Sequence, residues 1–167
     1  EFSMVEHRPN RILVPVELTE LSQPVLEYGY FMAKTFGAEL QVLHVWEPPR
    51  YVGYAVMVNA GDHTQKLIEA IEAEARVALD ALLEKAPPPE GVNVDSVLKS
   101  GFAANVIVET CEEGFELIVM GTHGRSGVRH LLVGSVAERT TRFASVPVVI
   151  VPTIANDNRV LYASRGV

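Results

Sequence analysis

Residues 115–120, Phe-Glu-Leu-Ile-Val-Met, are the stretch of sequence that decides the fold. Their core, Leu117 to Met120, is a short and unbroken apolar run. Such a run is typical of a strand buried on both faces, as strands are in parallel sheets covered by helices. Four more strands are expected, at residues 12–16, 40–46, 92–99 and 146–151. Pro15 has no N–H group to donate, so it should lie at the end of the first of them.

Helical patterns occupy the intervals between these strands. Helices are predicted at about residues 22–37, 64–85, 101–111 and 135–144. Ser22 is expected to cap the first helix, and Gly37 to close it. Residues 51–62 show no clear period and are expected to be irregular. The alternation of strands and helices predicts an α/β domain with a mostly parallel sheet and right-handed crossovers.

The composition narrows the class of protein. The chain has 167 residues, of which 48% are hydrophobic and 21% charged, the balance of one ordinary globular domain. Its formal net charge of −7 argues against a general nucleic-acid binder, which would carry a basic surface. The single cysteine, Cys111, excludes an intramolecular disulfide and favours a reducing compartment.

The ends of the chain bear on its location and boundaries. No apolar run approaches the roughly 20 residues that span a bilayer, and the N-terminus lacks a signal-peptide pattern. We therefore expect no membrane insertion and a cytoplasmic location. Glu1-Phe2-Ser3, ahead of Met4, resembles a cloning remnant. The expected organisation is an N-terminal extension at 1–9, one domain at 10–152 and a tail at 153–167.

The segment from Gly121 to Ser135 carries the candidate chemistry. It begins at the carboxyl end of the buried strand, where ligands bind in open α/β sheets, and it ends where a helix begins. A helix N-terminus offers unpaired N–H groups and a partial positive charge. Glycines let backbone amides approach a phosphate closely. Gly134 and Ser135 therefore suit a phosphate, with the Ser135 hydroxyl as a further donor.

The local charge also favours an anion. Residues 121–145 hold Arg125, Arg129, Arg139 and Arg142 with one acid, a net charge of +3 in a chain of −7. A positive island at a helix N-terminus suits a phosphate. The alternative interpretation is a solvated loop of glycines and arginines. A Walker-type P-loop and a dinucleotide fingerprint after the first strand are both absent.

The spacing Gly121-x2-Gly124-x9-Gly134-Ser135 resembles the nucleotide motif of the universal stress protein family. The resemblance extends over about residues 10–151, because the strand segments match those of the family in order and distance. It implies an α/β fold with a five-stranded parallel open sheet in the order 3-2-1-4-5. It also implies helices on both faces and a site between strands one and four. Members with this spacing generally bind ATP, so a regulatory stress-response module that binds ATP, AMP or ADP is the leading expectation.

The resemblance also implies the residues of the site. The adenine would rest near Pro15, Val16, Val45 and Met120. The ribose and phosphates would meet Gly121, Gly124, Gly134, Ser135 and Val136, with His123, Arg125 and Ser126 as phosphate neighbours.

Glu17 is a departure from the family pattern, which usually has Asp after the first strand to contact the nucleoside. The extra methylene changes the reach of the carboxylate by about 1.5 Å, enough to disturb a direct hydrogen bond. A Mg²⁺ ion accompanying the nucleotide would be held chiefly by phosphates and water.

The resemblance further implies a homodimer formed by antiparallel pairing of the last strands. Residues 146–151 are an apolar edge candidate, and exposed edges must be covered or paired. The alternative is that the tail, residues 153–167, covers this edge within one chain. A regulatory protein partner would read the nucleotide state, and the sequence does not name it.

Two other functions stay open. A slow ATPase or phosphotransferase would need a base or a metal-binding acid, and none is evident except Glu17, so no catalytic residue is assigned. A nucleotide-independent dimeric interaction protein would result if Glu17 marks a lost site. No residue spacing resembles a zinc site. His44 and Cys111 are expected to be structural core residues.

Overall fold

The computed structural model describes residues 8–49, 56–60, 63–122 and 134–153. The helices are α1 (Ser22–Phe36), α2 (Leu67–Lys85), α3 (Ala103–Cys111) and α4 (Ser135–Phe143). The strands are β1 (Arg11–Val16), β2 (Glu39–Trp46), β3 (Met57–Ala60), β4 (His63–Lys66), β5 (Val94–Ser100), β6 (Leu117–Gly121) and β7 (Val148–Val151).

The central sheet has five strands in the order β5-β2-β1-β6-β7, and every neighbouring pair runs parallel. Numbered along the chain within this sheet, the order is 3-2-1-4-5, so the predicted topology is confirmed. Pro15 is the penultimate residue of β1 and pairs with Leu43, close to the strand end where it was expected.

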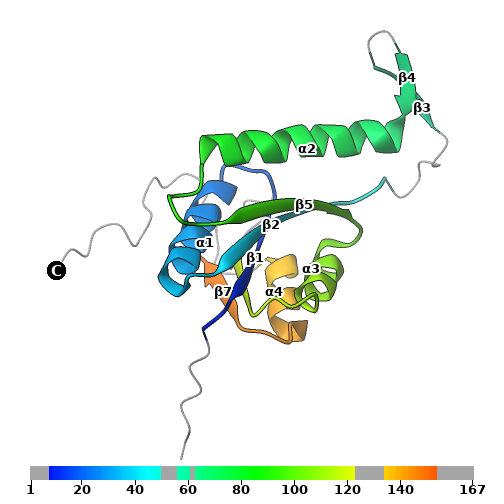
Figure 1. The fold of residues 1–167 in the computed structure, drawn as a ribbon. Coiled ribbons are helices and arrows are strands. Elements are labelled where there is room, and N and C mark those ends of the chain that lie inside the picture. The colour runs from blue at the N-terminus through cyan, green and yellow to red at the C-terminus, as the bar shows by residue number, and fades with distance from the viewer. Residues whose placement is uncertain (1–7, 50–55, 61–62, 123–133, 154–167) are drawn as a thin grey trace, which may run out of the picture.

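Helices cover both faces of the sheet (Figure 1). One core layer packs α1 and α2 against the sheet, through residues such as Val14, Leu26 and Leu79. The other packs α3 and α4 against the opposite face, through residues such as Leu13 and Ile107. Successive residues of a strand point to opposite faces, so β1 contributes to both layers. The core of β6 is buried from Leu117 to Met120, which confirms that this strand lies between two layers.

Close approach of α1 to β1 depends on Gly29. A Cβ atom placed there would lie 2.8 Å from the Val14 Cγ2 atom and 3.2 Å from the Leu40 Cδ1 atom, too close for either side chain. The absent side chain therefore lets α1 pack directly on β1 and β2.

The segment after β2 was predicted wrongly. Residues 57–66 contain an antiparallel hairpin, β3 and β4, in which Ala60 pairs with His63, so α2 begins at Leu67 and not at residue 64. The hairpin stands at the N-terminal end of α2, away from the central sheet (Figure 1). Three of the four residues of β3 are apolar and all four of β4 are polar, so neither strand shows the alternation of apolar and polar residues that marks a half-buried strand. The two residues between the paired ends, Gly61-Asp62, are a sequence typical of a two-residue hairpin turn.

The ends of α1 divide between a correct and a wrong prediction. Gly37 closes the helix in the left-handed conformation, with φ of 70°, as expected. Ser22 is not the cap. It is the first helical residue, and its buried Oγ atom accepts a hydrogen bond from the Thr19 N–H group at 3.1 Å. The serine thus orders the turn before the helix.

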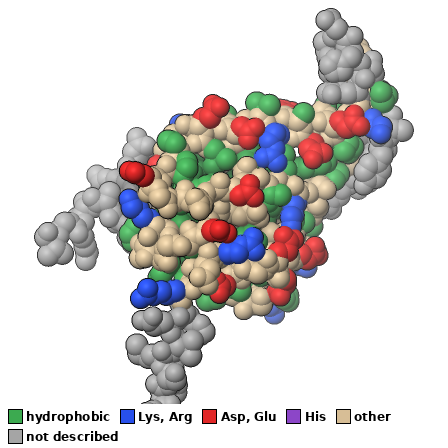
Figure 2. All heavy atoms as spheres, in the orientation of Figure 1, with side chains coloured by type: hydrophobic (Ala, Val, Ile, Leu, Met, Phe, Trp, Pro, Cys, Tyr) green, Lys and Arg blue, Asp and Glu red, His purple; other side chains and the backbone are tan. Residues whose placement is uncertain are grey.

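The distribution of charged side chains on the surface is that of an ordinary globular domain, as the composition predicts. Figure 2 shows acidic and basic side chains interspersed with apolar ones on one face, with no field of a single sign. Within the described ranges, no helix has the length and apolar character needed to cross a membrane.

Candidate functional site

β1 and β6, two neighbouring strands of the sheet, separate toward their carboxyl ends. β1 pairs with β2 along its whole length, from Arg11 to Val16. Its pairing with β6 in the described strands comprises only Ile12 with Leu117 and Leu13 with Ile118. The helices that follow β1 and β6 lie on opposite faces of the sheet (Figure 1). This is a topological switch point, where open α/β sheets bind ligands.

The carboxyl end of β1 is fixed by a buried histidine on the neighbouring strand. The His44 Nδ1 atom lies 2.8 Å from the Val16 carbonyl oxygen, and since a carbonyl only accepts, the ring nitrogen donates. Glu17 follows as a half-buried residue, and Leu18 then adopts a positive φ of 57°. The chain therefore changes direction sharply after the strand. Leu18 has a left-handed backbone conformation there, which bulky residues rarely adopt.

The carboxyl ends of β6 and β7 are joined by two threonines. The Thr122 Oγ1 atom accepts a hydrogen bond from the Thr153 N–H group at 3.0 Å and lies 3.3 Å from the Thr153 Oγ1 atom. The Thr122 N–H group donates to the Val151 carbonyl at 3.1 Å. A Cβ atom at Gly121 would lie 3.1 Å from Val25, so a larger residue would crowd α1. The end of β6 is thus held in place from both sides.

The start of α4 is held against this strand end. The Gly134 N–H group donates to the Thr122 carbonyl at 2.6 Å, and the Gly134 carbonyl accepts from Glu138 as the first bond of the helix. Gly134 is the N-cap residue, and no side chain caps the helix. Because its N-cap residue is a glycine, the first amides of α4 receive no side-chain acceptor from the cap position, and they lie beside the carboxyl end of β6.

Nine of the predicted site residues lie together at this end of the sheet. They belong to the ends of β1, β2 and β6 and to the start of α4: Pro15, Val16, Glu17, Val45, Met120, Gly121, Gly134, Ser135 and Val136. His123, Gly124 and Arg125 lie outside the described residues, as does Ser126. Thr122, Thr153 and the hydrogen bond of His44 were not predicted as parts of the site. The position of Thr122 directly after the strand was the available signal for it.

The two described arginines of the positive island lie away from the start of α4. Arg139 stacks on Phe102 and Phe143, with its Cζ atom 5.5 and 5.7 Å from the ring centroids. Arg142 stacks on Phe143 in the last turn of the helix. The helix carries both guanidinium groups away from Gly134, because they follow it by five and eight residues at 1.5 Å of rise each. Arg125 and Arg129 lie outside the described residues.

Two further expectations concern metals and the core. In the described part of the chain, no group of three or more His, Cys, Asp or Glu side chains could hold a metal ion. His44 and Cys111 are both buried, as predicted for structural residues.

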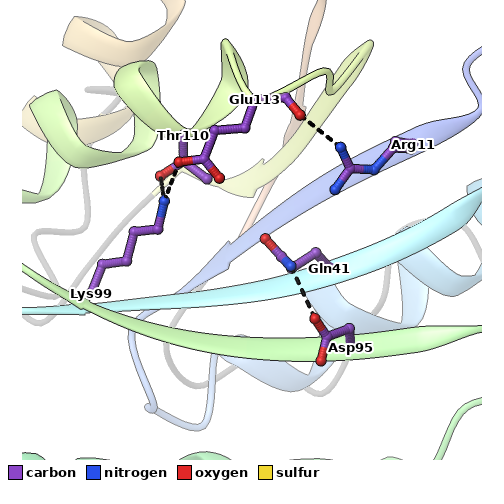
Figure 3. Close-up of polar contacts among 6 residues, drawn as sticks. All are labelled: Arg11, Gln41, Asp95, Lys99, Thr110 and Glu113. Atoms are coloured by element: carbon purple, nitrogen blue, oxygen red, sulfur yellow. Dashed lines mark hydrogen bonds and ion pairs between the residues drawn. The ribbon is translucent and has the colours of Figure 1, made fainter.

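A hollow of about 250 Å³ lies at the opposite end of the sheet, where β1, β2 and β5 begin. Three of its polar side chains, Arg11, Gln41 and Asp95, are engaged in hydrogen bonds (Figure 3). Arg11 donates to the Glu113 carbonyl at 2.7 Å and stacks on Phe115, and Gln41 donates to Asp95 at 3.1 Å. Because these contacts satisfy the groups internally, this hollow has the character of a structural joint.

The chain is similar to known proteins in both sequence and structure. The model of the universal stress protein family matches residues 9–152. The universal stress protein MJ0531 of Methanocaldococcus jannaschii is 31% identical over 147 residues, which cover 87% of this chain and 84% of the relative. YxiE, a universal stress protein of Bacillus subtilis, is 28% identical over 146 residues, covering 85% of this chain and 98% of the relative.

Solved structures agree in fold. The universal stress protein UspA from Lactobacillus plantarum superposes with a TM-score of 0.70 at 23% identity, over 86% of this chain and 97% of its own. A universal stress protein solved in complex with cAMP gives a TM-score of 0.59 at 20% identity, over 87% of this chain and 98% of its own. Since the family model matches most of the chain and the sheet has the order expected from the resemblance, the chain belongs to the universal stress protein family.

Proposed function

We propose that the chain binds an adenine nucleotide, with ATP as the leading ligand and AMP or ADP as alternatives, at the carboxyl end of the sheet. One observation carries the proposal. The hydrogen bond from the Gly134 N–H group to the Thr122 carbonyl, at 2.6 Å, sets the uncapped start of α4 beside the end of β6. A helix start that lacks a capping side chain can donate its amides to phosphate oxygens, and its dipole favours the negative charge.

The remaining residues would serve the nucleoside. Val16 and Met120 are buried apolar residues at the ends of β1 and β6, where the strands separate, and Val45 lies on β2 next to them. Apolar walls with a few fixed polar groups are typical of small-molecule sites. Glu17 offers a carboxylate acceptor to a ribose hydroxyl or an adenine amine. Mg²⁺ would be bound through the phosphates and water.

A relative supports the ligand class. The universal stress protein solved in complex with cAMP has the same fold, and cAMP is itself an adenine nucleotide. We infer the same class of ligand for this chain from the shared fold together with the glycine spacing that ends at Gly134 and Ser135.

The proposal includes a homodimer through β7. This strand lies at one edge of the sheet, and its four residues are Val148, Val149, Ile150 and Val151. The strand carries no charge and no proline that would oppose pairing. Antiparallel pairing of β7 with β7 of a second copy would cover the β7 edge of both sheets. Nucleotide occupancy in this dimer would then be read by a regulatory protein partner.

The test begins with freshly purified protein, which is denatured so that mass spectrometry can identify any released nucleotide. The stripped protein is then titrated calorimetrically with ATP, ADP, AMP and cAMP, with and without Mg²⁺. We expect adenine nucleotide to be released or to titrate at one site per chain. A protein that arrives empty and binds none of the four nucleotides at millimolar concentration would refute the proposal.

A pair of variants tests where the nucleotide binds. Gly134→Asp adds bulk and negative charge at the start of α4 and should weaken ATP by about 100-fold or more. Asn93→Asp adds the same charge at the exposed opposite end of the sheet and should leave the affinity unchanged. Equal affinities of the two variants would contradict the placement of the phosphates.

A further inference from the structure

The surface formed by α3 and α4 exposes two phenylalanines. Phe102, directly before α3, is 46% exposed, and Phe143, the last residue of α4, is 58% exposed. Arg139 lies over both rings, and Arg142 lies over Phe143 with its Cζ atom 5.8 Å from the centroid. We call these four residues the Phe–Arg patch.

A groove adjoins the Phe–Arg patch. It has a volume of about 220 Å³ and runs between the two helices, lined by Ala104 and Val108 of α3 and by Arg139 and Phe143 of α4. Asn105 and Glu109 form its polar rim. The floor is therefore apolar, and the rim offers both donors and acceptors, as in grooves that receive a peptide helix.

The two guanidinium groups of the patch form no ion pair with the carboxylates that the structure describes. The chain has 21 acidic against 14 basic residues. Three other cations of the described part, Lys66, Arg76 and Lys99, do pair with carboxylates. Arg139 and Arg142 pair with none of the described carboxylates and stack on phenylalanine instead. A guanidinium within about 6 Å of a ring makes a cation–π contact and can still donate N–H groups to a carboxylate in bidentate fashion.

We propose that the Phe–Arg patch and its groove dock an acidic amphipathic helix of a partner protein. Aliphatic or aromatic side chains of that helix would fill the groove, and its carboxylates would meet Arg139 and Arg142. Exposed aromatic and arginine side chains around an apolar groove are the residues that dominate interface energies.

This proposal names the chemistry of the regulatory protein partner, an acidic helix. Its regulatory role, in which the partner reads the nucleotide state, rests on the proposed nucleotide binding. The link is α4 itself. This helix of nine residues begins at Ser135, directly after Gly134 and beside the proposed phosphates, and ends at Phe143 in the patch. One rigid element therefore connects the two sites.

The test is selection from a displayed library of helical 16-residue peptides, with aliphatic or aromatic anchors at helical spacing and Glu, Gln or Lys varied at the flanks. We expect the enriched peptides to be acidic. The synthetic winner is then titrated by fluorescence anisotropy. Arg139→Glu should weaken it at least tenfold, and Phe143→Ser about tenfold. Exchanging the peptide's glutamates for lysine should restore binding to Arg139→Glu.

Matched controls come from α1, on the other face of the sheet. Phe31 is 58% exposed, as Phe143 is, and Lys34 is an exposed cation. Phe31→Ser and Lys34→Glu should leave peptide affinity within twofold. Circular dichroism checks that all four variants are folded, as exposed positions allow. Enrichment of basic or uncharged peptides, no enrichment, or equal effects of the α1 and α4 substitutions would overturn the proposal.

The same titrations with Gly134→Asp separate this inference from the nucleotide proposal. Binding of acidic peptides that depends on Arg139 would support the docking surface even if the protein binds no adenine nucleotide. Failure to bind any adenine nucleotide would refute only the nucleotide site. ATP binding without any patch-dependent peptide refutes the docking surface and leaves the nucleotide site standing.

Discussion

The two ends of the central sheet are both polar, yet they use their polar groups differently. At the end where the strands begin, Arg11 donates to the Glu113 carbonyl and Gln41 donates to Asp95 (Figure 3). Asn10 donates to Glu116 at the same end. At the end where the strands finish, the Gly134 N–H group donates to the Thr122 carbonyl and His44 donates to the Val16 carbonyl. The N-cap residue of α4 is a glycine, which offers no capping side chain.

The difference distinguishes a structural end from a ligand end. Side chains that satisfy one another gain little from a ligand, because a ligand would have to break existing hydrogen bonds. Backbone amides without a side-chain acceptor gain much from a phosphate. A hollow of about 250 Å³ lies at the structural end, but the groups that line it are already engaged with the protein.

The largest expected effect concerns the structural end. Phe115 is 4% exposed and carries the stacked Arg11, with the Cζ atom 4.3 Å from the ring centroid. Phe115→Ala should lower the free energy of unfolding by about 3–5 kcal/mol because it empties a core position. Urea denaturation measures this loss. If the alanine variant does not fold, Phe115→Leu gives a smaller loss of the same sign.

The comparison requires that this damage stop short of the ligand end. ATP affinity of the folded Phe115 variant should stay within twofold of the unsubstituted protein. An affinity that falls more than tenfold in folded protein would show that the two ends are not independent.

The next effect concerns His44, which acts at the ligand end. His44→Leu leaves the buried Val16 carbonyl without its donor, which should cost about 1–3 kcal/mol of folding free energy. ATP affinity should fall as well, because the end of β1 loses its anchor. His44→Asn keeps a donor close to the position of Nδ1 and should recover most of both losses. Loss of stability with unchanged affinity in His44→Leu would remove β1 from the site.

The sheet was predictable from sequence because its strands are short apolar runs buried on two faces. Leu117 to Met120 could hardly be anything else, and the glycine spacing assigned the chain to a family of known topology. The hairpin at 57–66 was not predictable by the same argument, since neither of its strands is a buried apolar run or an alternation of apolar and polar residues.

The charge count in sequence included two arginines that lie away from the start of α4. Arg139 and Arg142 follow Gly134 closely along the chain, but the helix turns their side chains toward Phe102 and Phe143. A count of charges in a window carries no information about the face of the helix on which they lie. His44 could be predicted to be buried but not to donate to Val16, because that bond depends on the register between β1 and β2.

A smaller effect is expected at Glu17. Glu17→Asp restores the shorter carboxylate that the family pattern places there and should tighten ATP about tenfold, equal to about 1.4 kcal/mol. Glu17→Gln keeps the length but removes the charge, and should weaken ATP by a similar factor. Calorimetric titration of both variants provides the measurement. If both substitutions leave the affinity unchanged, Glu17 points away from the nucleotide.

The smallest effect lies in the helix layer behind the sheet, where Tyr30 of α1 donates to the carbonyl of Ala86, directly after α2, at 2.9 Å. Burial disfavours the charged phenolate and raises the pKa of Tyr30 from 10.0 to about 12. The folded protein therefore holds its proton more tightly than the unfolded chain. The resulting stability is fully present below pH 10 and is lost as the pH rises from 10 through 12.

Tyr30→Phe isolates this contribution. At pH 8 it should lower the free energy of unfolding by about 1 kcal/mol, because the buried Ala86 carbonyl loses its donor. Between pH 10 and 11.5 the variant should lose less stability than the unsubstituted protein, since the group whose pKa is raised is gone. Urea denaturation at a series of pH values gives both numbers. Parallel pH profiles would assign the alkaline loss to other groups, and any change in ATP affinity would join this layer to the ligand end.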